Sequence, residues 1–221
     1  MINRHPTDER LLAFARGALA GGEALLIAAH CDMCPHCAAK VQQFTETEAE
    51  SAFAESDNIM ESPAFSSMLA SITQQPVAER ILAKEQDEFI ELDGRKFKLP
   101  RSLKRYSHST GNWSKLVGKL WQAPVDIGGE GRANFIYMEK GGSVPEHTHK
   151  GNELTLVING AFSDGINDYD SGDFIAMNDS HTHAPFSEDK DGCLVFTIVE
   201  EPLHFTSGIA RLLNPFSHLF F

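Results

Sequence analysis

The sequence has few basic residues and no long apolar run, and each shortage excludes a class of protein. Its 221 residues contain 19 Lys and Arg against 31 Asp and Glu, a formal net charge of −12, so a phosphate backbone would be repelled and a direct nucleic-acid partner is not expected. The longest apolar run, 24–29, has six residues, whereas a membrane-spanning helix needs about 20. The polar, charged segment 1–10 lacks the apolar stretch of a secretory signal. We therefore expect a cytoplasmic protein without a membrane partner.

Cysteine is also scarce, and its placement excludes a disulfide framework. Of four cysteines, Cys31, Cys34 and Cys37 lie within seven positions and Cys193 lies far away. In a reducing compartment, clustered thiols beside histidines are more often metal ligands or redox centres than structural bridges. A buried apolar side chain is the simplest interpretation of Cys193, and a secondary target of an oxidant is the alternative.

The charge distribution divides the chain into three segments. Residues 86–112 carry a net +2, while 1–85 carry −6 and 113–221 carry −8. We interpret 86–112 as a basic, solvated linker that contains a hairpin around the Asp-Gly turn at 93–94.

Residues 1–85 show helical periodicity interrupted by turn signals. Thr7 or Asp8 can cap a first helix, 23–30 forms a short apolar second run, Pro35 suits the first turn of a third helix, and Ser62 precedes a fourth. Three or four short helices have a small core that a metal ion would stabilise. Some of their apolar side chains are candidates for a partner surface: Leu11, Phe14, Phe65, Met68 and Leu69.

After residue 113 the period changes from 3.6 to 2. Strand candidates recur at 133–138, 154–158, 173–177 and 194–199, separated by Gly- and Asp-rich turns. Short strands at regular spacing predict an antiparallel barrel or sandwich, followed by an apolar, helix-compatible tail until Pro215.

The first cysteine cluster has metal-ligand spacing. His30, Cys34 and Cys37 form H-x3-C-x2-C, which lets three side chains converge, and tetrahedral zinc needs a fourth ligand. His5 is the best candidate for it, with Cys31 and His36 as competitors that point elsewhere on a helix. A C-x-x-C redox motif is an alternative that lacks its βαβ context here.

This pattern resembles the zinc-binding anti-sigma domain of bacterial regulators that hold an extracytoplasmic-function (ECF) sigma factor inactive. The resemblance covers residues 1–85. The H-x3-C-x2-C spacing alone is moderately specific, and the upstream histidine and the size of the domain make the resemblance more specific.

A second cluster lies in the strand region. His147 and His149 alternate on a strand and point into one pocket, Glu153 opens the next strand, and His183 follows the 172–173 Gly-Asp pair. Three imidazoles and a carboxylate suit Zn²⁺, Mn²⁺, Fe²⁺ or Ni²⁺. The spacing resembles the two metal motifs of the cupin barrel, which implies His147, His149, Glu153 and His183 as ligands. Asn178 replaces a frequent proline, and His181 is a rival ligand.

Together the two segments resemble ChrR-type anti-sigma factors. The resemblance implies an α+β protein of two domains, a zinc-stapled helical bundle at 1–85 and an all-β cupin barrel at 113–221. It further implies a regulator, without catalytic residues, that sequesters an ECF sigma factor and releases it on oxidative stress such as singlet oxygen or an organic hydroperoxide. Zinc is expected at both centres, with Mn²⁺, Fe²⁺ or Ni²⁺ as alternatives in the barrel.

A metal-dependent cupin enzyme of the dioxygenase or isomerase type is the alternative. Such an enzyme needs acid or base groups near its metal, and the candidates are Tyr137, Glu139 and Glu146.

Overall fold

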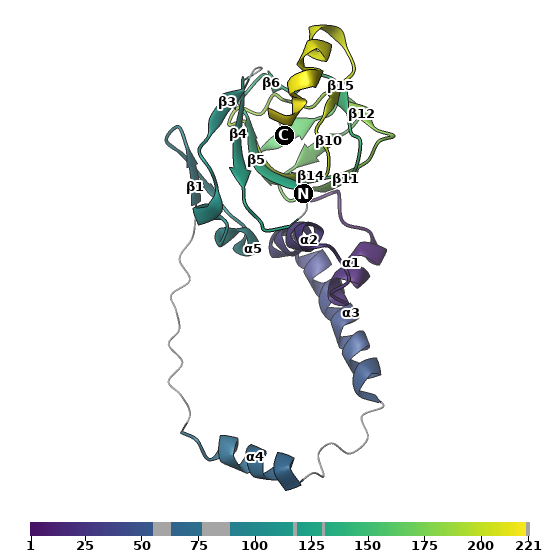
Figure 1. Ribbon diagram of the computed structural model, residues 1–221, viewed down its shortest axis with the longest axis vertical. Helices are drawn as coiled ribbons and strands as arrows, with labels where there is room; N and C mark the ends of the chain where they lie inside the picture. The colour runs from purple at the N-terminus through teal and green to yellow at the C-terminus, as the bar shows by residue number, and fades with distance from the viewer. Residues whose placement is uncertain (55–62, 77–88, 117–118, 130, 220–221) are drawn as a thin grey trace.

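The computed structural model describes residues 1–54, 63–76, 89–116, 119–129 and 131–219, with helices near the N-terminus and strands in the rest of the chain (Figure 1). This confirms the expected order of a helical region followed by an antiparallel β structure. The division at residues 85 and 112 stays a prediction.

The helices begin at the predicted signals. In α1 (Asp8–Ala15) the Thr7 hydroxyl accepts the Arg10 N–H at 3.4 Å, and α3 (Pro35–Ala54) begins at its proline. Between α2 (Gly21–Met33) and α3, Cys34 has an extended backbone, so the chain changes direction there. The fourth helix, α4 (Pro63–Thr73), also begins at the predicted proline.

Apart from a two-stranded hairpin at 89–98, the described strands form one large and two small antiparallel sheets. The large sheet has the order β11-β8-β14-β5-β4-β3, and the small ones have the orders β10-β9-β13-β6 and β12-β7-β15. The bounds of the large sheet are β3 (Ser114–Leu116), β4 (Leu120–Val125), β5 (Arg132–Met138), β8 (Glu153–Asn159), β11 (Phe174–Met177) and β14 (Cys193–Val199). Those of the small sheets are β6 (Gly142–Ser143), β7 (His147–Thr148), β9 (Ala161–Ser163), β10 (Asp168–Asp170), β12 (Thr182–His183), β13 (Phe186–Ser187) and β15 (His204–Phe205). The four predicted strands correspond to β5, β8, β11 and β14, whereas β3 and β4 were not predicted.

Both faces of the large sheet are buried. Along β14, Cys193 and Val195 belong to the cluster inside the barrel, and Leu194, Phe196 and Ile198 belong to a second cluster on the outer face. Successive side chains of a strand point to opposite faces, so a strand that is apolar at nearly every position requires cover on both sides.

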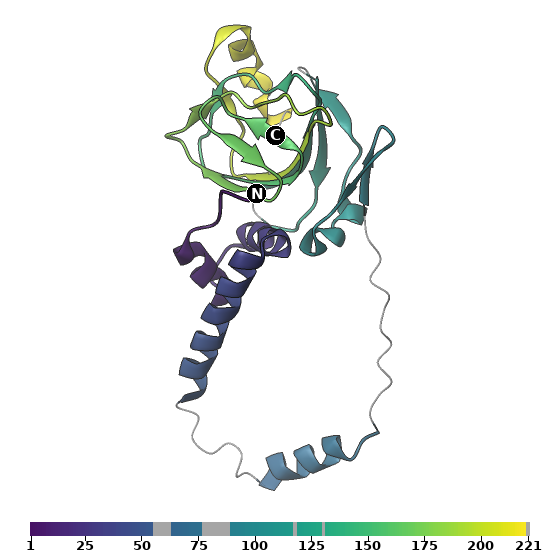
Figure 2. The ribbon, with the colours of Figure 1, turned by 180° about the vertical axis from the view of Figure 1, so that it is seen from behind.

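The outer face is covered by α2, by the hairpin of β1 (Phe89–Leu92) and β2 (Arg95–Lys98), and by α5 (Arg101–Lys104) (Figures 1 and 2). Leu26, Phe97 and Leu103 are all buried in the same cluster as the sheet. The Asp93-Gly94 turn is as predicted, with positive φ at both residues. The expectation of a solvated linker is wrong for the described residues of this segment, because one face of the hairpin is buried.

Two further elements extend from the barrel and the helices. No residue of α4 is buried, and both ribbon views show it apart from the other described elements. At the opposite end of the barrel, the C-terminal segment Gly208–Leu219 is a 3-10 helix that continues through Pro215, where the sequence predicted an end. Within the described part of the chain, every helix is too short or too polar to cross a bilayer.

Candidate metal centres

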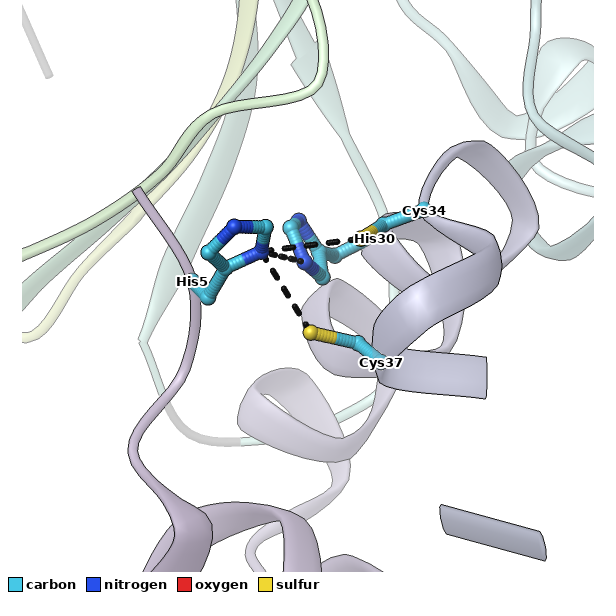
Figure 3. Close-up of side chains that lie close together, drawn as sticks. All are labelled: His5, His30, Cys34 and Cys37. Carbon is cyan, nitrogen blue, oxygen red and sulfur yellow. Dashed lines mark hydrogen bonds between the residues drawn. The ribbon is translucent and has the colours of Figure 1, made fainter. Parts of the chain in front are cut away.

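The helical region brings together the four side chains predicted for its site (Figure 3). His5 Nδ1 lies 3.4 Å from His30 Nε2, 3.5 Å from Cys34 Sγ and 3.4 Å from Cys37 Sγ. Donors that share a tetrahedral zinc ion, with bonds of about 2.0–2.3 Å, are separated by about 3.4–3.8 Å. The three distances from His5 Nδ1 therefore fit a tetrahedral site, and all four donor atoms lie within 4.8 Å of one another.

Local structure explains this convergence. His30 lies in the last turn of α2 and its carbonyl accepts the Cys34 N–H at 2.8 Å. The extended backbone of Cys34 then leads into the first turn of α3, where Cys37 faces back toward α2. His5 reaches the same point from the segment that precedes α1.

Burial favours the uncharged forms of His30 and Cys37 in the absence of a cation. It lowers the pKa of His30 to about 4, and, together with the charge of Cys34, it raises the pKa of Cys37 to about 12. A bound divalent cation would reverse the effect on the thiol, because it stabilises the thiolate directly. Two soft sulfurs and two imidazoles are a donor set that fits zinc.

The two competing residues lie outside this group. Cys31 is half-buried, and burial raises the pKa of its thiol to about 11. His36 is exposed, with its ring centroid 5.8 Å from that of His5. Neither shares the common point on which the four donors converge.

The barrel brings together the second predicted group. His183 Nε2 lies 2.9 Å from His147 Nε2 and 3.0 Å from His149 Nε2, and His149 Nε2 lies 2.8 Å from Glu153 Oε2. Neighbouring ligands of an octahedral ion with bonds of about 2.1 Å are separated by about 3.0 Å. His183 Nε2 and Glu153 Oε2 are 4.0 Å apart, close to the separation of ligands on opposite sides of such an ion.

Buried polar atoms at this centre lack partners. Among the described residues, Glu153 Oε2 and the Nδ1 atoms of His149 and His183 are buried without a hydrogen bond. The other oxygen, Glu153 Oε1, accepts the hydroxyl groups of Thr155 at 3.0 Å and Thr197 at 3.2 Å. An orphaned carboxylate oxygen aimed at converging imidazoles fits a bound cation, because its burial without a partner is costly.

The protonation states of the residues at the barrel centre favour the binding of a cation. Burial raises the pKa of Glu153, but the close contact with His149 Nε2 and the nearby histidines outweigh it and lower the pKa to about 2. Burial lowers the pKa of His147 to about 4, and the Pro145 carbonyl accepts its Nδ1–H at 2.8 Å. That hydrogen bond leaves the Nε2 lone pair of His147 directed toward the other ligands.

Asn178, which stands where cupins often have proline, and His181, the competing ligand candidate, lie in the same turn. The Asn178 carbonyl accepts the His181 N–H at 3.0 Å, and the Asn178 side chain lies 2.8 Å from His181 Nδ1. Asparagine thus stabilises this turn with its own side chain, and His181 is exposed, outside the converging group.

An apolar cavity of about 50 Å³ adjoins the centre inside the barrel. A water molecule needs about 10–15 Å³ by this measure, so the cavity accepts only a few non-hydrogen atoms. The polar side chains of its lining are three candidate ligands and the two threonines that bind Glu153. Its lining is Ile136, Met138, Val144, His147, Glu153, Thr155, Phe162, Ile175, Met177, His183, Pro185, Val195, Thr197, Val199 and Leu203.

The acid–base candidates for an enzyme lie outside this lining. Glu139 accepts the Trp121 indole N–H at 2.7 Å, and Glu146 accepts the Thr206 hydroxyl at 2.7 Å. Tyr137 donates to the Asp191 carbonyl at 2.7 Å. Each of the three is thus occupied by a structural contact.

Thr155 and Thr197 were not predicted from the sequence. Thr155 lies two residues after Glu153 on β8, so strand alternation alone places both on the same face, and this signal could have found it. Thr197 lies on β14 opposite Thr155, and only the strand pairing reveals that contact.

Comparisons with known proteins agree with the expected resemblance. Residues 107–201 match the family described as the ChrR cupin-like domain. The chain is 27% identical to the anti-sigma-E factor ChrR of Cereibacter sphaeroides, covering 97% of this chain and 98% of that protein. The crystal structure of Rhodobacter sphaeroides SigE in complex with the anti-sigma ChrR matches with a TM-score of 0.68 and 25% identity, covering 90% of this chain and 99% of the matched chain. The similarity therefore includes both the helices and the barrel.

Proposed function

We propose that this protein is a ChrR-type anti-sigma factor, which binds an ECF sigma factor and keeps it inactive. The observation that carries the proposal is the coverage of the similarity, which spans 97% of this chain and 98% of its ChrR relative. A cupin barrel alone serves many functions, whereas helices with a His-Cys centre followed by a barrel form a specific combination. Net negative charge suits a protein that covers a basic sigma surface.

The sigma-binding surface is assigned to α4. Met68, Leu69 and Ile72 are 53%, 45% and 56% exposed and lie on one side of this helix. Apolar side chains gathered on an exposed helix are typical of a partner surface. Of the other residues expected there, Leu11 is buried and Phe14 packs against the core, so the first helix contributes less than expected.

Zinc is assigned to the helical centre, where His5, His30, Cys34 and Cys37 would hold it. Four protein donors leave no position for an outside ligand, which is the pattern of a structural site. Zinc is also assigned to the barrel centre, with Mn²⁺, Fe²⁺ or Ni²⁺ as alternatives because imidazole and carboxylate donors suit all four.

We assign the barrel centre as the site that senses the inducing signal. This signal is an oxidant such as singlet oxygen or an organic hydroperoxide. The apolar cavity that adjoins this centre inside the barrel supports the assignment. The metal, when bound, supplies a Lewis acid next to this cavity. His147, Glu153 and His183 line the cavity and hold their donor atoms toward the same point, while its apolar walls exclude charged molecules.

A metal-dependent enzyme is the second candidate, favoured by the same cavity. Turnover needs acid or base groups that can move protons, and the polar side chains in the lining are already committed to the metal centre. The lining therefore supports a sensor better than a catalyst.

Co-purification tests the anti-sigma proposal. The full chain, loaded with zinc, is co-expressed with each ECF sigma factor of the same organism, and a tag on the sigma factor is used for capture. We expect a 1:1 complex with one of them that survives gel filtration. Recovery of the two proteins in separate peaks for every sigma factor, with both centres loaded, would contradict the proposal.

A further inference from the structure

The segment before α1 lies against a turn of the barrel at residues 170–173. Asp173 Oδ1 accepts the N–H of Asn3 at 2.7 Å and the N–H of Arg4 at 2.9 Å. The Phe174 N–H in turn donates to the Arg4 carbonyl at 3.0 Å. Three hydrogen bonds thus fix the backbone that leads directly into His5.

The same turn reaches the other histidine of the helical centre. The Gly172 carbonyl lies 2.8 Å from His30 Nδ1 and accepts its N–H. Because one ring nitrogen is a donor there, the lone pair of the other, Nε2, faces His5 and the cysteines. Gly172 has φ +94°, and a Cβ at this position would clash with the side chain of Ile2. The positive φ therefore favours glycine, and a larger residue would also require the Ile2 side chain to move.

We propose that the turn 170–173 of the barrel completes the helical metal centre, with the Gly172 carbonyl orienting His30 and the Asp173 carboxylate holding the segment that carries His5. Asp173 and Gly172 are positioning residues that act through the two histidines. This inference rests on the proposal that the helical centre binds a metal.

The surroundings of Asp173 support a positioning role. Its side chain is fully buried, and the Asp170 N–H donates to its second oxygen at 2.9 Å. A buried carboxylate that accepts three backbone N–H groups forms strong, charge-assisted hydrogen bonds. His5, in contrast, is exposed and precedes the first helix, so without Asp173 its ordering would cost conformational entropy on metal binding.

The turn is also bonded to the strand that carries a ligand of the other centre. The Gly172 N–H donates to the Val157 carbonyl at 2.8 Å, and the Asp173 carbonyl accepts the Val157 N–H at 3.1 Å. Val157 lies on β8, which begins at Glu153. One short turn therefore contacts elements of both centres.

Cobalt binding to the full-length chain tests the inference. Thiolate-to-cobalt charge-transfer absorption reports only the helical centre, because the four donors of the barrel centre include no sulfur. The apparent Co²⁺ affinity is measured by competition with a chelator in the original protein and in Asp173→Ala. We expect a loss of about 10–100-fold, the usual effect of removing a group that orients a metal ligand, with a weaker tetrahedral d–d spectrum.

Three further variants separate positioning from a general loss of structure. Asp173→Asn keeps an acceptor oxygen and should restore most of the affinity. Asn3→Pro removes one donated N–H without altering the barrel turn and should weaken Co²⁺ binding if Asp173→Ala fails to fold. Asp170→Ala makes the same change to an exposed side chain of the same turn and should retain the original affinity.

The outcomes are distinguishable. Absence of thiolate-to-cobalt absorption in the original chain would overturn the metal centre itself, and with it this part of the proposed function. Normal absorption with less than a twofold change in affinity in Asp173→Ala and in Asn3→Pro would overturn the positioning role alone.

Discussion

His30 Nδ1 lies 2.8 Å from the carbonyl oxygen of Gly172, so a candidate metal ligand of the helical region is hydrogen-bonded to the barrel 142 residues later. Leu26 on the same helix is buried in the cluster that covers the outer face of the large sheet. The helical centre and the barrel therefore share both a hydrogen bond and a hydrophobic core. A change in either part can reach the other through these contacts.

The assignment of ligands at the helical centre predicts that Cys34 is needed for metal binding and that Cys31 is not. Cys34→Ser should lower the metal content from two ions per chain to one, because the closed site loses a soft donor. Cys31→Ser, a matched change three residues earlier, should keep both ions. Metal content per chain, measured by inductively coupled plasma mass spectrometry, checks this. Loss of an ion in Cys31→Ser with none lost in Cys34→Ser would reverse the assignment.

The exposed apolar side of α4 should be required for binding of the sigma factor. Met68→Asp combined with Ile72→Asp places two charges in the proposed interface, so we expect at least about a 30-fold loss of affinity, or ~2 kcal/mol. Ser67→Asp combined with Ala70→Asp adds the same charge to the opposite side and should bind normally. Isothermal titration with the sigma factor gives both values. Equal affinity of the two double variants would exclude this surface.

The metal-free chain should lose stability as the pH falls from about 6.5 toward 4. Burial lowers the folded-state pKa values of His30 and His147 to about 4, below the unfolded value of about 6.5. Between these values the unfolded state binds more protons, so the free energy of unfolding decreases, on the order of 3 kcal/mol for each histidine. Urea unfolding with a chelator present measures this. His147→Gln should flatten the pH dependence, and the exposed His36→Gln should leave it unchanged.

The barrel centre should be dispensable for inhibition and necessary for release. Replacing His147 and His149 with Ala should leave the sigma complex intact but slow its dissociation under an organic hydroperoxide. His181→Ala, which changes an exposed histidine of the neighbouring turn, should release normally. Dissociation is followed by gel filtration after oxidant treatment. Release of the double variant at the original rate would place the sensor elsewhere.

Cys193 should take no part in that release. Its thiol is fully buried in the barrel, and burial raises its pKa, so little reactive thiolate forms. Cys193→Ala should therefore dissociate under oxidant like the original chain. Loss of release in this variant alone would identify Cys193 as the oxidised residue.

Much of this arrangement could be predicted from local patterns. The H-x3-C-x2-C spacing, the Pro35 helix start and strand alternation at His147 and His149 each depend on a few neighbouring residues, and the structure brings the corresponding side chains together. Thr155 was within reach of the same alternation argument.

The packing of the helices on the barrel was harder to predict. The clue lies in β14, where apolar residues at nearly every position indicate two buried faces. The basic residues of the hairpin led to the wrong prediction of a solvated linker. Lys96 and Lys98 face solvent, but they lie on either side of the buried Phe97. Contacts such as Asp173 with Asn3 join distant parts of the chain and leave no local pattern.

In vitro transcription tests the central claim most directly. Core RNA polymerase, the cognate ECF sigma factor and its promoter are combined with increasing amounts of the zinc-loaded full chain, and the run-off transcript is quantified. The account predicts that transcription falls to background near one chain per sigma factor, while a promoter read by the housekeeping sigma factor is unaffected. Undiminished ECF-dependent transcription at a tenfold excess of the loaded chain would contradict it.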